Sequence, residues 1–269
     1  MTIALIDGDI VAFRCAASAE TEEQWIALHR TDQLIQEILS AVNASHYRVF
    51  ISGETNFRKE IDPEYKANRK DRIKPVHLDA CREFLVAQHK AEKCDGIEAD
   101  DMLGINQEGE TTIICSIDKD LLQIPGRHYR FVKKEFVDVS DEDGARSFYL
   151  SSLVGDTSDN IFGVQGIGKV KGTRALADCS SAYEMYQVCK ELYNDDERFH
   201  RNLSLLWILR QHLPDGAYKP PVQVQGGCED AGQVEEGIPV GLGTTSARSV
   251  PSNQIGDTKC ENNIDEATE

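Results

Sequence analysis

The sequence predicts an α/β fold in which a largely parallel central sheet is flanked by helices. Three short runs rich in β-branched residues, at 2–6, 47–51 and 111–115, are typical of strands that are buried on both faces. Between these runs, apolar residues recur every three or four positions, as they do along one face of a helix. Strands that alternate with helices are joined by crossovers, which favour parallel pairing.

The predicted elements follow one another in a consistent order. TIALI at 2–6 is the first strand, and a helix at 26–42 leads to the second strand, YRVFI at 47–51. A helix at 77–90 and a short helix opened by EADDMLGI come before the third strand, TTIIC at 111–115. After these come an alternating hairpin or edge pair at 127–140 and helical patterns at 147–155, 171–178, 181–193 and 198–211.

Composition bounds the class of protein and its domains. There is no apolar run of about 18 residues, which a membrane span would need, and MTIALIDGDIVAF lacks the basic leader of a secretory signal. Eight cysteines occur without a CxxC pair, which excludes the usual zinc spacings and favours reduced thiols in the cytoplasm. We expect a core at 1–145, a helical module at 146–213 and a disordered acidic tail at 214–269, where no periodicity persists.

Nine acidic residues form four compact clusters near the ends of predicted elements. They are Asp7 and Asp9, then Glu98, Asp100 and Asp101, then Asp118 and Asp120, and finally Asp156 and Asp159. LIDGD and SIDKD directly follow strands, EADD opens a helix, and GDTSDN is expected at a helix–loop junction. Since sites in open α/β sheets assemble at the carboxyl ends of the strands, the four clusters are expected to converge.

Converging carboxylates repel one another, so this arrangement requires a counter-charge. Hard divalent cations supply it, and a site made of carboxylate oxygens suits Mg²⁺ or Mn²⁺. Two such ions, about 3.5–4 Å apart, can activate water and stabilise the leaving oxygen of a phosphodiester. The sequence therefore predicts a two-metal site that acts on a phosphate.

The basic residues are also unevenly distributed. The net charge of −17 by itself argues against a nucleic-acid partner, yet residues 58–74 hold seven bases against four acids. A glycine-rich turn follows the last acids and contains Gly163, Gly166, Gly168, Lys169 and Lys171. Its backbone amides and the start of the next helix can hold a phosphate, although an ordinary connection between two helices has the same pattern.

Taken together, these blocks resemble the structure-specific 5′ nucleases, which include flap endonucleases, the 5′-nuclease domain of bacterial DNA polymerases and phage 5′→3′ exonucleases. The matching blocks are IDGD, NFRKEIDPEYKANRK, EADDMLG, SIDKDL and GDTSDNIFGVQGIGK, which lie in the family's order from residue 5 to about residue 177. NFRKEIDPEYKANRK is most similar to the phage branch, and the chain carries no polymerase segment, as expected of a free-standing phage enzyme.

The resemblance implies a PIN-like 5′-nuclease core, a helical arch at about 57–76 and a C-terminal helix–three-turn–helix module that grips duplex DNA. It implies that two Mg²⁺ or Mn²⁺ ions are held by Asp7, Glu98, Asp100, Asp101, Asp118, Asp120, Asp156 and Asp159. Lys66 and Arg69, three apart on one helix face, match the arch bases that meet the scissile phosphate, and with Asp7, Glu98, Asp100 and Asp118 they are the implied catalytic residues. The implied DNA contacts are Arg58, Lys66, Arg69, Lys74, Gly163, Gly166, Gly168, Lys169 and Lys171, and the glycine loop is also the implied K⁺ site.

The implied activity is Mg²⁺-dependent hydrolysis of phosphodiesters near the 5′ ends of DNA. The chain would then act as a 5′→3′ exonuclease or flap endonuclease in phage DNA replication or degradation. The expected substrates are duplex ends, nicks and 5′ flaps, with RNA–DNA hybrids as a further class. We expect a monomer in the host cytoplasm, with no membrane partner.

One position departs from the family pattern. The family usually has an aspartate at the end of the strand before the NFR block, where this chain reads Ile51, Ser52 and Gly53. Either Glu54 or Asp9 substitutes, or the first metal is held more weakly. We favour Glu54, because it is the only acid nearby in the sequence.

Two other functions remain open from the sequence. A DNA-binding replication protein without catalysis would account for the missing acid. A phosphatase with an aspartyl nucleophile would use the DxD of LIDGD, but it leaves EADD and the basic KANRK block without a role.

Overall fold

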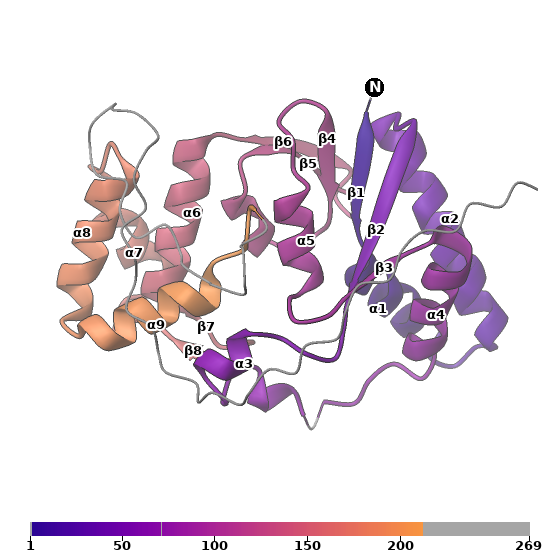
Figure 1. The fold of residues 1–269 in the computed structure, drawn as a ribbon, viewed down its shortest axis with the longest axis horizontal. Coiled ribbons are helices and arrows are strands. Elements are labelled where there is room, and N and C mark those ends of the chain that lie inside the picture. Colours follow the sequence, from indigo (N-terminus) through magenta and orange to yellow (C-terminus); the bar gives the residue numbers. More distant parts are fainter. Residues whose placement is uncertain (1, 71, 212–269) are drawn as a thin grey trace, which may run out of the picture. The chain divides into compact units, whose positions relative to one another are not determined.

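The computed structural model describes residues 2–70 and 72–211, so the tail expected at 214–269 lies outside the described residues. A six-stranded sheet has the order β3-β2-β1-β4-β5-β6 (Figure 1). Its strands are β1 (Ile3–Asp7), β2 (His46–Ser52), β3 (Glu92–Cys94), β4 (Thr112–Cys115), β5 (Gly126–Arg130) and β6 (Glu135–Val139). All neighbouring strands pair in parallel except β5 and β6, which form the antiparallel edge pair. The predicted largely parallel sheet is confirmed.

In the core, strand β3 and helix α1 were not predicted. β3 has the sequence EKC, which carries no β-branched residue, and it forms because its backbone pairs with the last three residues of β2. Helix α1 (Gly8–Ser18) begins directly after β1, and Asp7 caps it by accepting a hydrogen bond from the Ile10 amide. β3 forms because of its partner strand, and the start of α1 is set by the capping side chain of Asp7. Neither interaction produces a periodic pattern of apolar residues in the sequence.

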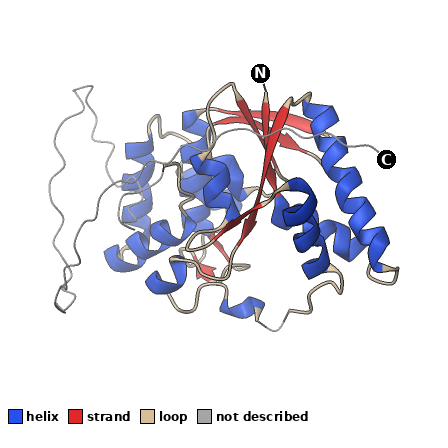
Figure 2. Cartoon of the chain, turned by 45° about the vertical axis from the view of Figure 1, so that its right-hand side comes forward, coloured by secondary structure: helices blue, strands red, loops and turns tan. Residues whose placement is uncertain are grey.

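Helices lie at the predicted patterns and flank the sheet (Figure 2), although the last of them ends at Leu206 and not at residue 211 as predicted. They are α2 (Gln24–Val42), α4 (Leu78–His89), α5 (Ala99–Ile105), α6 (Asp141–Val154), α7 (Lys169–Ala175), α8 (Ala182–Tyr193) and α9 (Asp196–Leu206). The first turn of α5 carries Asp100 and Asp101, and Glu98 is its N-cap. EADD therefore opens a helix as expected.

Alternate residues of the strands face opposite layers, because side chains alternate along a strand. Ile6 and Ile51 belong to a core with residues of α1, α2 and α4. Leu5, Phe50 and Ile114 face the other way, toward residues of α5. The central strands of the sheet are thus covered on both faces by apolar residues.

The C-terminal helices surround a second apolar core that includes Phe148, Leu153 and Phe199. We expected GDTSDN at a helix–loop junction, but β7 (Gly155–Asp156) and β8 (Ile161–Phe162) form a small antiparallel hairpin there. The chain does not break near residue 145, since α6 spans that position. The division into two domains stays a prediction.

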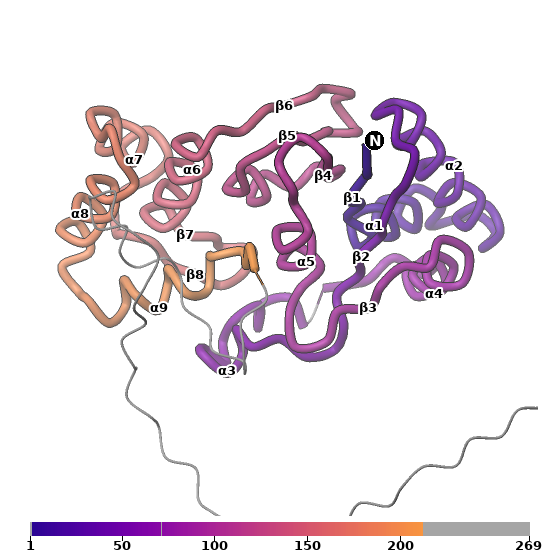
Figure 3. The backbone as a smooth tube through the Cα atoms, turned by 45° about the horizontal axis from the view of Figure 1, so that its top comes forward, coloured from indigo at the N-terminus to yellow at the C-terminus, as the bar shows by residue number. Residues whose placement is uncertain are grey.

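The basic segment between β2 and α4 is only partly helical (Figure 3). It contains α3 (Arg58–Ile61) and a single 3-10 turn, η1 (Ala67–Arg69), preceded by Lys66 in the left-handed conformation. Lys66 and Arg69 are therefore brought together by one tight turn rather than by a helix face as we expected. In the part of the chain that the structure describes, no helix is long and apolar enough to cross a membrane.

Candidate active site

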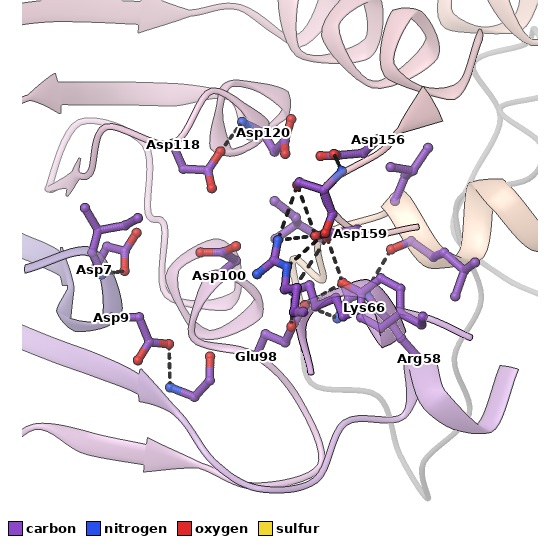
Figure 4. A pocket seen from close by; sticks show the side chains of 18 of the residues that line it. Asp7, Asp9, Arg58, Lys66, Glu98, Asp100, Asp118, Asp120, Asp156 and Asp159 are labelled. Carbon is purple, nitrogen blue, oxygen red and sulfur yellow. Dashed lines mark hydrogen bonds and ion pairs between the residues drawn. The ribbon is translucent and has the colours of Figure 1, made fainter. Parts of the chain in front are cut away.

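The predicted acidic clusters line one cavity of about 350 Å³ at the carboxyl ends of β1 and β4 (Figure 4). The acidic residues that line it are Asp7, Asp9, Glu98, Asp100, Asp118, Asp120, Asp156 and Asp159. They come from the end of β1, the start of α1, the first turn of α5, the loop after β4 and the β7–β8 hairpin. The convergence expected from the sequence is present for eight of the nine acids, and Asp101 is absent from the lining.

Asp7 is held rigidly where β1 becomes α1. One carboxylate oxygen accepts a hydrogen bond from the Ile10 amide at 3.0 Å, and the other accepts one from the Ser116 hydroxyl at 2.7 Å. Burial, helped by the neighbouring charges of Asp9 and Asp118, raises the pKa of Asp7 to about 7 against the opposing hydrogen bond from Ser116. The Asp7 carboxylate is thus held in one orientation, and a nearby positive charge would stabilise its ionised form.

The loop after β4 presents a second pair of carboxylates. Asp118 accepts a hydrogen bond from the Asp120 amide at 2.9 Å, which fixes the turn between them. Burial, followed by the charge of Asp118, raises the pKa of Asp120 to about 7. Figure 4 shows both side chains facing the cavity opposite Asp100.

Asp100 lies in the centre of the cluster. Burial raises the pKa of its carboxyl well above the ordinary value, and the charges of Asp7, Asp118 and Glu98 add to this effect. Among the described residues, no ion pair joins a basic side chain to Asp7, Asp100 or Asp118. These three carboxylates therefore share this end of the cavity without an ion-pair partner, although the charge of Lys66 partly opposes the rise in the pKa of Asp100.

The donor set fits hard divalent cations. All the candidate ligands are carboxylates, their mutual repulsion requires positive charge, and oxygen ligands of this kind suit Mg²⁺ or Mn²⁺. Within residues 2–70 and 72–211, no three acidic, histidine or cysteine side chains are arranged closely enough to bind one metal ion together. Asp7, Asp100, Asp118 and Asp120 line the same cavity, and we take them as the candidate ligands.

The other end of the cavity is neutralised by the basic segment. Lys66 forms ion pairs with Glu98 and, at 3.6 Å, with Asp159, while Arg69 also pairs with Asp159. The Tyr65 hydroxyl donates to Glu98 at 2.9 Å. Burial by itself would raise the pKa of Glu98, but Lys66 and Arg58 outweigh burial and lower it. Lys66 and Arg69, the two basic residues expected to take part in catalysis, thus lie at the site and are paired with carboxylates.

Arg58 and Asp101 have another placement than the resemblance implies. Arg58 is 2% exposed, and its two terminal nitrogens donate to the two carboxylate oxygens of Asp101 at 2.7 and 2.8 Å. Asp101 also accepts from the backbone amides of Glu98 and Leu209, each at 3.0 Å. The expected metal ligand Asp101 and the expected DNA contact Arg58 therefore form a buried ion pair. Arg58 nevertheless lines the cavity while Asp101 does not, and the DNA contact of Arg58 and the metal-ligand role of Asp101 stay predictions.

The glycine-rich turn reaches the surface as expected. Gly166 has a φ of +77°, which favours glycine, and Gly163 packs so tightly against the backbone of Leu153 that no side chain would fit. Lys169 and Lys171 are exposed, and Lys171 donates to the backbone oxygen of Gly166 at 2.9 Å. Lys74 is also exposed, beyond the end of η1, and Gly168 caps α7.

The sequence did not indicate several residues that contribute to the site. Ser116 orients Asp7, Tyr65 bridges to Glu98 and Asp159, Arg82 pairs with Asp9, and Phe13 lines the wall with half of its side chain exposed. Tyr65 adjoins Lys66 in the YKANR block and could have been included on that ground. The others come from elements whose contacts are made only by folding.

The comparisons with known proteins agree with this geometry. The family profile described as "5'-3' exonuclease, N-terminal resolvase-like domain" matches residues 2–149. The chain is 26% identical over 238 residues to a 5′-3′ exonuclease of Buchnera aphidicola, a match that covers 76% of this chain and 79% of the relative. It is 28% identical over 235 residues to DNA polymerase I of Bacillus caldotenax, covering 76% of this chain but only 27% of the polymerase.

Solved structures share the fold. A 5′-exonuclease of bacteriophage T5 with bound zinc superposes with a TM-score of 0.60 at 22% identity, covering 77% of this chain and 89% of the phage protein. The phage T5 flap endonuclease in a complex with DNA and metal ions gives a TM-score of 0.61 at 20% identity, with the same two coverages.

The family assignment depends on the order of the acidic blocks, on their convergence at the carboxyl ends of parallel strands, and on the profile match over more than half of the chain. On these grounds, the chain belongs to the family of 5′-3′ exonucleases with an N-terminal resolvase-like domain.

Proposed function

We propose that this chain is a metal-dependent 5′ nuclease that hydrolyses phosphodiesters of DNA near a 5′ end. The observation that carries the proposal is the cluster of Asp7, Asp100 and Asp118, which have no ion-pair partner among the described residues and lie beside a basic segment. Buried like charges without partners destabilise a fold. A bound cation would remove this cost, and it therefore accounts for the presence of the three acids in one cavity. The relatives named as 5′-3′ exonuclease and DNA polymerase I support the same conclusion.

The residues of the chain divide the work between two ends of the cavity. Asp7, Asp100, Asp118 and Asp120 would hold two Mg²⁺ or Mn²⁺ ions, which supply charge neutralisation of the phosphate and activation of water. Lys66 and Arg69 now bind Glu98 and Asp159, and they would exchange these carboxylates for the scissile phosphate. Glu98 and Asp159, once released, would complete the set of ligands.

The glycine-rich turn would hold the duplex next to the cut. Lys169 and Lys171 are exposed there, and contacts to phosphates are independent of sequence and sensitive to salt. Phe13, exposed on the cavity wall, offers a face on which a terminal base can stack. A K⁺ ion in the turn would have to use main-chain oxygens other than that of Gly166, which Lys171 already occupies.

A DNA duplex carrying a 5′-labelled flap tests the proposal directly. We expect short 5′-labelled products in Mg²⁺ and none in EDTA, and the product ladder on one hairpin separates exonuclease from flap cleavage. Binding of the duplex without any cleavage in Mg²⁺ or Mn²⁺ would favour a non-catalytic DNA-binding protein. Release of the label as inorganic phosphate would favour a phosphatase.

Replacement of Lys66 by alanine tests the exchange of partners. We expect kcat to fall by roughly 10²–10³-fold, because one preoriented cation that stabilises the charged phosphate is lost. The mutation also removes the counter-charge of Glu98, so the metal-free protein should unfold at a lower temperature.

Lys70→Ala is the matched control, because Lys70 has the same charge, is exposed and does not line the cavity. It should change kcat by less than a few-fold. Equal effects of the two mutations on kcat would mean that the segment acts only through its net charge.

A further inference from the structure

At the end of β2 this chain lacks the aspartate that the family usually has, so one expected metal ligand is missing. The structure limits which nearby acid can replace it. A Cβ at Gly53 would overlap the carboxylate of Asp95 and the backbone oxygen of Cys94, so no acid fits at that position. The side chain of Glu54 is 87% exposed and interacts with Lys93 at 3.5 Å. Glu54 does not line the cavity, and our expectation that it substitutes for the missing aspartate is not supported.

Asp9 reaches the end of β2 from the opposite direction. It lies in the first turn of α1, and one of its carboxylate oxygens accepts a hydrogen bond from the backbone amide of Ser52, the last residue of β2, at 2.9 Å. Figure 4 shows Asp9 next to Asp7 at the same end of the cavity. The two carboxylates are close enough for the charge of Asp9 to raise the pKa of Asp7.

Arg82 of α4 holds Asp9 in this position. One terminal nitrogen of Arg82 pairs with the second oxygen of Asp9, and the other donates to the backbone oxygen of Ser52. Asp9 and Arg82 both line the cavity, and their side chains are 29% and 26% exposed. The end of β2 is therefore closed by a three-part contact that links β2, α1 and α4.

We propose that Asp9 takes the place of the absent strand-end acid as a metal ligand, and that Arg82 is the positioning residue that holds it there. This inference rests on the proposed function, since it assigns a ligand within the same site. A carboxylate has about four lone-pair positions, and the contacts with Ser52 and Arg82 leave about two of them for an ion. Ligating carboxylates are commonly held by such outer hydrogen bonds.

The alternative role for Arg82 is a direct contact with the phosphate. The geometry favours positioning, because both terminal nitrogens of Arg82 are already engaged, one with Asp9 and one with the backbone of Ser52. A phosphate contact would need Arg82 to release the carboxylate that its own charge orients. The two roles predict different kinetic and binding results.

The test measures metal binding in the absence of DNA, by calorimetric titration of Mn²⁺ into the full chain. The variants are Asp9→Asn, Arg82→Gln, Arg82→Lys and Glu54→Gln. We expect Asp9→Asn and Arg82→Gln each to weaken one Mn²⁺ site by roughly 10–100-fold, with a smaller loss for Arg82→Lys, because lysine keeps the charge but not the forked contact. Glu54→Gln should bind Mn²⁺ like the wild type and retain its activity.

Several outcomes would overturn the assignment. These are wild-type Mn²⁺ binding by Asp9→Asn, weakened binding by Glu54→Gln, or an Arg82→Gln protein with unchanged Mn²⁺ affinity and a raised KM for DNA. Failure of the proposed function is distinguishable, because the wild type itself would then release no labelled product from the flap in Mg²⁺ or Mn²⁺, whatever its affinity for Mn²⁺. A circular dichroism melt of each variant confirms folding, and Arg82→Lys, the mildest change, keeps the assignment testable if Arg82→Gln does not fold.

Discussion

Replacement of Asp100 by asparagine is expected to abolish cleavage and, at the same time, to stabilise the metal-free protein. Asp100 lies at the centre of the carboxylates, and burial together with the charges of Asp7, Asp118 and Glu98 raises its pKa. Asparagine has nearly the same shape, removes one negative charge, and can donate hydrogen bonds to the carboxylates that remain. Relief of the repulsion should increase the free energy of unfolding by roughly 1–3 kcal/mol in EDTA at neutral pH.

The loss of activity follows from the same substitution. A neutral amide is a poor ligand for a hard cation, so we expect kcat on a 5′-labelled flap to fall by at least about 10²–10³-fold in Mg²⁺. Added Mg²⁺ should also raise the melting temperature of the wild type more than that of the variant, because a ligand that binds the folded state more tightly stabilises it more at the same concentration.

Asp178→Asn is the matched control, since Asp178 is an exposed acid remote from the cavity lining. It should leave both the activity and the melting temperature in EDTA near the wild-type values. An Asp100→Asn protein that still cuts in Mg²⁺, or that melts at a lower temperature than the wild type in EDTA, would contradict the assigned role.

Replacement of Asp101 by alanine is expected to lower the free energy of unfolding by about 3–5 kcal/mol, the range found when one partner of a buried ion pair is removed. The guanidinium of Arg58, 3% exposed, would lose both of its charge-assisted hydrogen bonds to Asp101. The amides of Glu98 and Leu209 would lose their acceptor as well. Because a typical domain is stable by only 5–15 kcal/mol, the loss would be easily measured.

Urea unfolding followed by circular dichroism measures the effect as a shift of the midpoint at constant m-value. Glu142→Ala is the matched control, because Glu142 pairs with Arg146 at 2.8 Å but is 57% exposed. An exposed i,i+4 pair is worth only about 0.3–0.5 kcal/mol. If Asp101→Ala kept wild-type stability and instead lost one metal site, Asp101 would be a ligand after all, and the present placement would be wrong.

The Arg58–Asp101 pair also links the site to the C-terminal segment. Arg58 donates to the backbone oxygens of Leu205 and Trp207, and Asp101 accepts from the Leu209 amide. The helix that carries Glu98 and Asp100 is thereby fixed to residues that lie about a hundred positions further along the chain. The position of Asp101 in EADD predicts a metal ligand. In the structure its carboxylate instead binds Arg58 and the Leu209 amide, which are distant in the sequence.

Much of the fold could be predicted because its signals are local. β-branched runs and helical periodicity report burial along an element, and they located β1, β2 and β4 and most of the long helices. β3 and the β7–β8 hairpin are too short to show a period, and they form because another strand supplies their hydrogen bonds. The resemblance implies a helical arch in the basic segment, but this segment forms only α3 and one 3-10 turn, and its backbone and side chains bond to the turn between β7 and β8.

The amino-acid sequence by itself determined the family, the sheet and the set of carboxylates, because spacing along the chain places acids at the ends of strands and helices. Only the tertiary structure decided which of these side chains face the cavity. Glu54 and Asp9 are both acids near the gap in the motif, yet Glu54 faces solvent while Asp9 meets Ser52. Lys66 and Arg69 bind acids here, and Arg58 and Asp101 bind each other. The physical reason is that a charged side chain takes the partner that folding brings within a few ångströms, and that partner comes from a distant part of the sequence.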